Sequence, residues 1–311
     1  MGPMGVALLA SFFFSFTFLL NDWLHQSGGN WLWTASLRYF WMLPMLFAVV
    51  YLQKGHLKVW QNIKAQPLPW FVWSTVGFGF FYAGITLASL YAPAWLVAST
   101  WQVTIVAGTL ISPFVRSKGE KLTRIPLWTL VFSGIILLGV FLIQWQHLHR
   151  VTAGTFWLGL LSALVAAVSY PLGNRQMMRH VAGRLRAPER IYGMTLVSMP
   201  FWLVLSGIGL YQSGLPSRSA VVSTFGVAML SGVVATTLFF KATDAAQGDV
   251  FQLGAVEATQ SAQVLFTVLG GVLWLGARWP TLYTWVGLLL IVVGMAFHAL
   301  FQKHARDIEI G

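Results

Sequence analysis

The sequence predicts an all-α polytopic membrane protein with about ten transmembrane helices. Of its 311 residues, 57% are hydrophobic and only 9% are charged, whereas about 25% are charged in a typical soluble domain. The mean hydropathy of the whole chain is +0.71. Apolar runs long enough to cross a bilayer follow one another along the chain, separated by short polar or turn-rich segments.

Breaking the chain at those segments gives the expected spans. They are 4–26, 30–52, 68–90, 94–115, 126–146, 153–173, 190–211, 220–242, 250–275 and 280–302. Pro93 marks a reversal between the third and fourth spans, because proline cannot continue a helix. The run Met4–Leu24 has no basic segment before it and no clean cleavage site. We therefore expect it to be the first membrane helix and not a removed signal peptide.

The basic residues predict the orientation. With the N-terminus inside, fifteen of the nineteen Lys and Arg residues fall on the cytoplasmic side, three fall on the other side, and Arg38 lies within a span. Cytoplasmic loops carry such an excess. Both termini are therefore expected on the cytoplasmic side of a bacterial inner membrane. The same bias explains the net charge of +11, so no nucleic acid is expected as a partner.

The two halves of the sequence resemble each other weakly. Asn21 ends the first span as Asn174 ends the sixth, and Arg38 opens the second span as Arg190 opens the seventh. Because five spans is an odd number, the second half must be inverted relative to the first. We therefore expect two inverted five-helix units, residues 1–150 and 151–311. Such repeats are typical of secondary transporters, with a binding site near the midplane of the bilayer.

Several segments resemble the drug/metabolite transporter superfamily, in particular its EamA-like ten-helix exporters. The segments of the first half are Ile85–Pro93, Gly119-Glu-Lys-Leu-Thr-Arg124 and Gly134–Gly139, and Lys241–Gly294 repeats their order. The connection Gly276-Ala-Arg-Trp279 departs from the pattern because it lacks an acid. Ser169-Tyr-Pro-Leu-Gly-Asn174 and Val256-Glu-Ala-Thr-Gln-Ser261 resemble the multidrug-resistance efflux branch. The resemblance implies a ten-helix basket of two inverted repeats that exports small organic solutes by alternating access.

The ninth span carries a carboxylate, Glu257. At about 1.5 Å per residue it lies roughly 10 Å along the helix, where a carboxylate is costly in lipid and is expected to face protein or water. Gln252, Thr259, Gln260 and Gln263 fall on the same polar arc at helical spacing. Glu257 is therefore the first candidate for a proton- and substrate-binding group, and a structural ion pair is the alternative.

Arg38, Trp95, Trp101 and Gln102 are expected to form the opposite wall of a cavity. Arg38 either anchors a substrate carboxylate or pairs with Glu257, and the alternatives are a structural contact with a backbone carbonyl or snorkelling to the outer interface. Indole faces attract organic cations, although ordinary helix packing explains both tryptophans equally well. The phenylalanines of the first span are expected mainly to contact lipid or to pack between helices: Phe12, Phe13, Phe14, Phe16 and Phe18.

Two groups of polar residues lie at span ends. Asp22 and His25 are one turn apart, and they are either a solvated helix end or an exit gate that relays protons. Lys241, Asp244 and Asp249 are interpreted as a solvated turn with weak local ion pairs, with a cytoplasmic entrance as the alternative.

The sequence lacks the signatures of several enzyme classes. It has no P-loop, no His-Glu-x-x-His and no Gly-x-Ser-x-Gly pattern. It has no cysteine, and His147 and His149 are too few for a zinc site. We expect no cofactor and no metal.

The predicted function is that of a secondary transporter, not an enzyme. A single chain, acting as a monomer, would export small cationic or aromatic solutes by proton antiport. An amino-acid or metabolite exporter or facilitator without ion coupling is the alternative, in which Arg38 holds the substrate carboxylate and Glu257 its amine. Other classes left open are a membrane enzyme acting on lipid and a channel.

Overall fold

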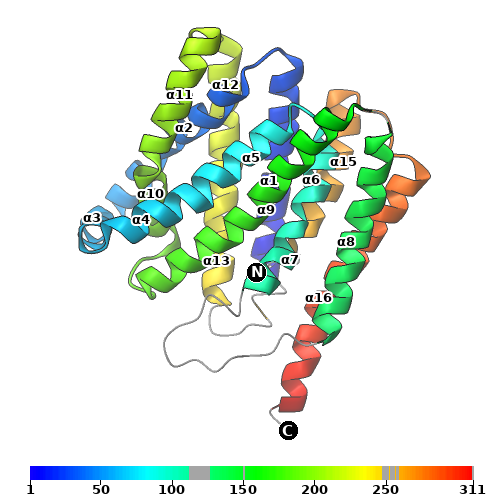
Figure 1. Ribbon diagram of the computed structural model, residues 1–311. Coiled ribbons are helices and arrows are strands. Elements are labelled where there is room, and N and C mark those ends of the chain that lie inside the picture. Colours follow the sequence, from blue (N-terminus) through cyan, green and yellow to red (C-terminus); the bar gives the residue numbers. More distant parts are fainter. Residues whose placement is uncertain (112–126, 150, 247–251, 253–255, 257–258, 310–311) are drawn as a thin grey trace.

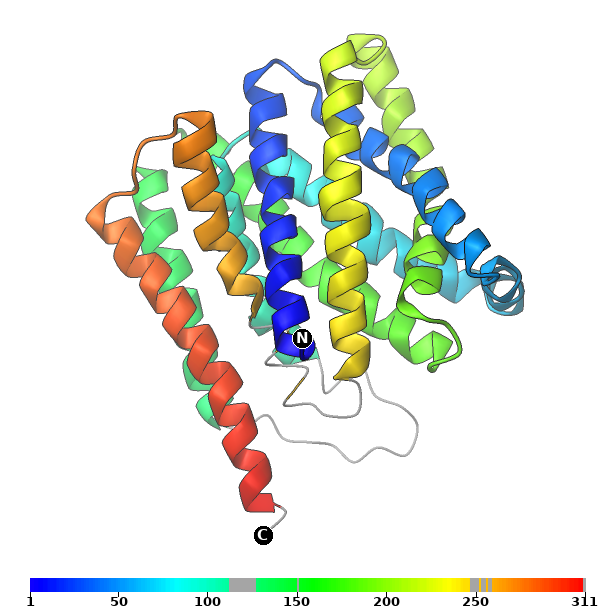
Figure 2. The same ribbon diagram turned by 180° about the vertical axis from the view of Figure 1, so that it is seen from behind.

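The protein is a bundle of helices (Figures 1 and 2). The computed structural model describes residues 1–311 except 112–126, 150, 247–251, 253–255, 257–258 and 310–311. Every regular element among the described residues is a helix, and none is a strand. The motif Gly119–Arg124, Asp249 and Glu257 lie outside the described residues.

The first half of the chain has helices at each of the five predicted spans. Helices α1 (Pro3–Gln26), α2 (Trp31–Leu52) and α8 (Leu127–Leu148) are each one span. The third span consists of α4 (Pro67–Ser74), the π-helical segment η1 (Thr75–Phe80) and α5 (Phe81–Ala88). The fourth consists of α6 (Ala94–Trp101) and α7 (Val103–Ile111), which meet at Gln102.

The second half contains the remaining helices. The sixth span is α9 (Ala153–Val181), and the seventh is the pair α10 (Ala187–Val197) and α11 (Met199–Ser213), bent by 46°. The eighth span again contains a π-helical segment, η3 (Ala228–Ala235), between α12 (Arg218–Val227) and α13 (Thr236–Ala245). The short 3-10 helix η4 (Thr259–Ser261) leads into α15 (Ala262–Leu275), and α16 (Leu282–Glu309) follows.

These elements confirm the predicted fold class, an all-α polytopic membrane protein. In the described part of the chain, six helices are long and apolar enough to cross a membrane, or seven if the bent pair is one span. The described part of the chain also contains three shorter apolar helices, Leu130–Trp145, Thr259–Leu275 and Leu282–Phe297. Each of these segments falls on one of the ten predicted spans.

Two segments predicted as polar connections are helical. Helix α3 (His56–Ala65) occupies the connection after the second span, with Val59 buried and Trp60 exposed. Helix α9 continues eight residues beyond its predicted end at 173, because no glycine or proline interrupts 174–182. It ends where Ala182 and Gly183 adopt left-handed conformations, with φ of 46° and 73°, as is common at helix C-termini.

Helix α1 lies in the middle of the bundle. It packs against α15 and α6 on one side and against η3 and α13 on the other, and Figure 2 shows it between the orange α15 and the yellow eighth span. Helices α8 and α16 pair along one edge. The start of α1 and the end of α16 lie at the same end of the molecule (Figure 1), as an even number of spans requires.

The third and sixth spans meet through two glycines. A Cβ atom built on Gly173 of α9 would lie 2.3 Å from the Cα atom of Gly77 in η1 and 2.9 Å from the carbonyl oxygen of Trp73. Both atoms belong to the backbone and cannot rotate away. Small residues at such crossings allow membrane helices to approach closely, so this contact fixes the third span against α9.

We therefore expect Gly173→Ala to destabilise the protein by about 1–3 kcal/mol, the usual cost of overpacking. Thermal unfolding in detergent micelles measures this change. Gly134→Ala in α8 is the matched control, because its new methyl group would meet no atom within 4 Å. Equal melting temperatures for the two variants would contradict the close packing of α9 on η1.

Candidate functional site

A small cavity lies between α1, α5, α6, α9 and the start of α15. Most of its lining is aromatic: Phe14, Phe18, Phe81, Trp101 and Tyr170, with Ile85 beside them. The Phe81 ring centroid lies 5.0 Å from that of Trp101 and 4.8 Å from that of Tyr170. Rings from three different spans therefore form one cluster at the wall of the cavity.

The polar lining consists of Thr17, Gln260 and Gln263. Gln263 is 1% exposed, and among the described residues its Nε2 has no hydrogen-bond partner. An unpaired buried amide donor is costly, so its position at the cavity wall suits it to a bound molecule.

The chain departs from α-helical geometry next to this polar lining. Irregular backbone at membrane depth is tolerated where protein buries it or where it lines a cavity. The Ser11 Oγ of α1 donates a hydrogen bond to the Thr259 carbonyl oxygen at 2.9 Å, and the Thr259 hydroxyl donates to the Val256 carbonyl oxygen at 2.7 Å. Helix α1 thereby supports the short 3-10 turn that carries Gln260 to the cavity.

Arg38 lies behind this cavity and is 2% exposed. Its Cζ atom lies 3.9 Å from the centroid of the Tyr82 ring, in a cation–π contact. Its Nη2 donates to the Ser231 hydroxyl at 3.3 Å, and Ser231 in turn shares a short hydrogen bond with Thr17. Because Thr17 lines the cavity, two hydrogen bonds connect the guanidinium to the cavity wall.

The structure brings together part of the predicted site. Trp101, Gln260 and Gln263 line the cavity, and Thr259 lies in the supporting turn. Of the other predicted residues, Arg38 lies behind the cavity and Trp95 is half-buried. Gln102 is fully buried, and its amide donates to the Ala98 carbonyl oxygen at 3.0 Å. Gln252 is exposed.

Sequence reasoning missed several lining residues. Phe14 and Phe18 were expected to contact lipid or to pack between helices, but they line the cavity, whereas Phe12 is exposed. Phe14, Thr17, Phe18 and Asn21 follow the spacing i, i+3, i+4, i+7, which marks one helix face. The Thr17 hydroxyl and the Asn21 amide, two polar groups on one face of an otherwise apolar helix, were the signal that could have identified this face as one that packs inside the protein.

Asp22 forms its hydrogen bonds with partners other than His25. Asp22 is 8% exposed, and its Oδ2 accepts a hydrogen bond at 2.9 Å from the backbone N–H of Ala94, the first residue of α6. Its Oδ1 accepts from the Gln26 amide at 3.0 Å. His25 is exposed. The Asp22 carboxylate thus satisfies a free N–H at the positive end of α6.

The interpretation of Asp244 as part of a solvated turn is wrong. Its Oδ1 accepts a hydrogen bond at 2.9 Å from Nη2 of Arg190, whose side chain is only 3% exposed. The ion pair joins α13 to α10, and the Arg190 guanidinium also lies 4.7 Å from the centroid of the Phe240 ring. The spacing in the sequence could not show this pair because its partners are 54 residues apart.

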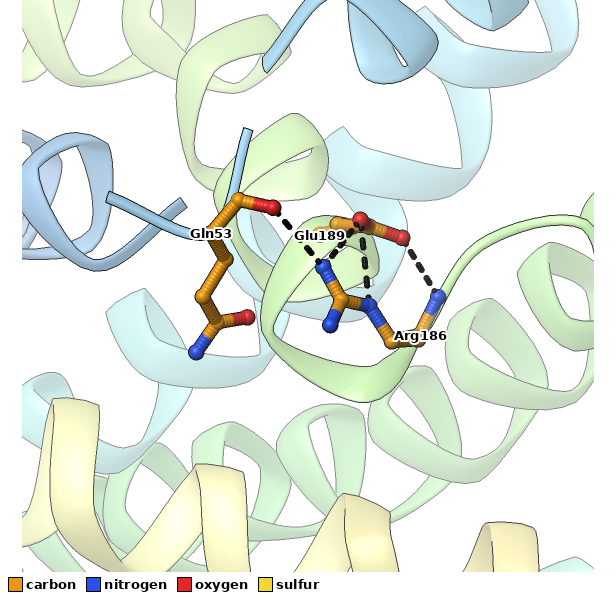
Figure 3. A network of polar contacts seen from close by, with 3 residues as sticks. All are labelled: Gln53, Arg186 and Glu189. Carbon is orange, nitrogen blue, oxygen red and sulfur yellow. Dashed lines mark hydrogen bonds and ion pairs between the residues drawn. The ribbon is translucent and has the colours of Figure 1, made fainter. Parts of the chain in front are cut away.

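A second polar network holds the start of α10 (Figure 3). Glu189 Oε2 accepts from the Arg186 backbone N–H at 2.8 Å, and Oε1 accepts from Arg186 Nη2 at 2.8 Å. Arg186 Nη2 also donates to the carbonyl oxygen of Gln53, just after α2, at 3.5 Å. The network therefore satisfies the helix end and joins it to the second span.

The fold defines a multi-pass membrane protein with an aromatic, amide-bearing cavity inside its bundle. Residues 1–304 match the family described as "Putative multidrug resistance efflux transporter". The chain belongs to this family, as the motifs Ser169–Asn174 and Val256–Ser261 indicated.

Two relatives extend the comparison. The chain is 44% identical to "Uncharacterized protein YjlA" of Bacillus subtilis (strain 168), over 96% of this chain and 94% of that protein. It is also 44% identical to an "Uncharacterized 42.1 kDa protein in intracellular alkaline protease 3'region" of Shouchella clausii, over 85% of this chain and 70% of that one. A solved structure entitled "Crystal structure of protein" has a TM-score of 0.66 at 17% identity, covering 97% of this chain and 98% of that chain. This likeness shows the fold alone.

We predict that Asp22→Ala lowers the free energy of unfolding by about 1–2 kcal/mol, the usual cost of losing a helix cap. Asp22→Asn keeps an acceptor for the Ala94 N–H and should lose less. Unfolding in detergent micelles measures both. Unchanged stability in Asp22→Ala would contradict the capping role. Lost transport in a stable Asp22→Asn would instead support the gate predicted from the sequence.

Proposed function

We propose that the chain is a secondary transporter that exports small cationic or aromatic solutes in exchange for protons. The single observation that carries the proposal is the cavity. Aromatic rings from α1, α5, α6 and α9 enclose it, and amides from η4 and α15 provide polar contacts. Ligand sites are mostly apolar cavities with a few placed polar groups, and ring faces attract organic cations. The efflux family to which the chain belongs supports export.

Alternating access would arise from two inverted five-helix units, residues 1–150 and 151–311. Equivalent irregularities support this arrangement, because the third and eighth spans each contain a π-helical segment, η1 and η3. Arg38 and Arg190, near the starts of the second and seventh spans, are both 2% exposed. The distribution of basic residues supports cytoplasmic termini in a bacterial inner membrane.

Glu257 would couple solute movement to protons. It lies three residues before Gln260 and six before Gln263, and both glutamines line the cavity. One carboxylate that binds either a proton or a cationic solute gives exchange, because the two ligands compete for it. Ten spans provide a complete pathway in one chain, so the proposal includes a monomer and assigns no cofactor, enzymatic step or nucleic-acid partner.

The test is uptake of tetraphenylphosphonium into inverted membrane vesicles with and without an imposed pH gradient. We expect the gradient to drive uptake by the wild type, and Glu257→Gln to lose at least about tenfold of that response, since it cannot carry a proton. Glu309→Gln, at the end of α16, is the control for loss of one carboxylate and should respond as the wild type does.

Each outcome has a definite meaning. Uptake that ignores the gradient in the wild type would contradict proton exchange. Uptake by a folded Glu257→Gln that still follows the gradient would remove Glu257 from the coupling step while leaving export in place.

A further inference from the structure

A buried positive charge adjoins the cavity, and the described residues do not neutralise it. The Arg38 side chain is 2% exposed within a membrane span, where an isolated charge is expensive. In the described part of the chain, no carboxylate lies within ion-pair distance of Arg38. Arg190 is equally buried and is paired with Asp244 at 2.9 Å. The two arginines therefore differ in what balances their charge.

Hydrogen-bond donors are in excess around Arg38. Its Nε and Nη1 and the Nδ2 of Asn21 have no partner among the described residues. Asn21 is also 2% exposed. Tyr82 brings the two residues together, because its ring lies under the Arg38 guanidinium and its hydroxyl donates to Asn21 Oδ1 at 3.0 Å. All three unpartnered atoms are N–H groups, which an anion can satisfy and a cation cannot.

The Tyr82 contact leaves these donors available. A guanidinium carries its N–H groups in its own plane, as a rigid fork. That planar fork matches the two oxygens of a carboxylate, and such charge-assisted bonds are among the strongest in proteins.

We propose that Arg38 and Asn21 form a subsite for the carboxylate of an aromatic solute. The ring of the solute would lie in the cavity beside Phe81 and Trp101, and its carboxylate would reach past Thr17 to the guanidinium. The inference rests on the proposed function, since it places one group of the transported molecule. Among the aromatic solutes of the proposed function, it predicts that those with a carboxylate, aromatic acids and zwitterions, bind at this subsite.

Equilibrium binding of radiolabelled phenylacetate to the purified protein in nanodiscs tests the subsite. Phenylacetamide has nearly the same shape and no charge, so it is the matched ligand. We expect phenylacetate to bind at least about tenfold more tightly than phenylacetamide, as a hydrogen-bonded ion pair implies. Arg38→Gln should remove that preference and leave phenylacetamide binding within a factor of about three, while Arg38→Lys should retain part of the preference.

Controls separate the subsite from general charge and folding. Arg218→Gln removes an exposed arginine at the start of α12 and should bind phenylacetate as the wild type does. Asn21→Leu deletes one donor and keeps Arg38, so it should also weaken phenylacetate binding. This variant replaces Arg38→Gln as the test if Arg38→Gln does not fold. Equal affinity of the wild type for the two ligands, or absence of phenylacetate binding, would overturn the subsite. The uptake assay with tetraphenylphosphonium tests the proposed function separately, and its result does not depend on this subsite.

Discussion

A guanidinium held over a tyrosine ring in the membrane interior is the contact on which four spans depend. Arg38 from α2 lies on Tyr82 from α5 and donates to Ser231 in η3, which bonds to Thr17 of α1. Hydrocarbon offers no water to such a charge, so protein must surround it. Two of these helices, α1 and α5, also line the cavity. Burial of the charge and formation of the cavity are thus parts of the same packing.

Departures from regular α-helix support this arrangement. The π-helical segments η1 and η3 flank the central helices, and Gly77 in η1 lets α9 approach within contact of its backbone. The 3-10 turn at Thr259–Ser261 is supported by Ser11. Each irregular segment has residues buried against protein, among them Gly77, Ser231 and Gln260, as bilayer energetics require. These are the segments with the least regular backbone hydrogen bonding.

The sequence predicted the spans because their number and length follow from hydropathy and bilayer thickness, and periodicity placed Gln260 and Gln263 on one face. Hydropathy could not separate Phe14, which lines the cavity, from Phe12, which is exposed, because lipid and protein interior are equally apolar. It also could not show that Asp22 caps α6 or that Asp244 pairs with Arg190, since both contacts join distant segments. Helix α9 continues beyond its apolar run because a helix can include polar residues and no glycine or proline interrupts 174–182.

The central claim is that solutes occupy the cavity beside Gln263, and thiol modification tests it directly. The chain has no cysteine, so Gln263→Cys supplies the only thiol for a small charged methanethiosulfonate reagent. Ser217→Cys, at the exposed start of α12, is the accessible control. The account predicts that Gln263→Cys reacts and that a transported solute slows its reaction severalfold, while Ser217→Cys reacts at one rate throughout. A reaction at Gln263→Cys that saturating solute leaves unchanged would contradict the assignment of this cavity as the transport site.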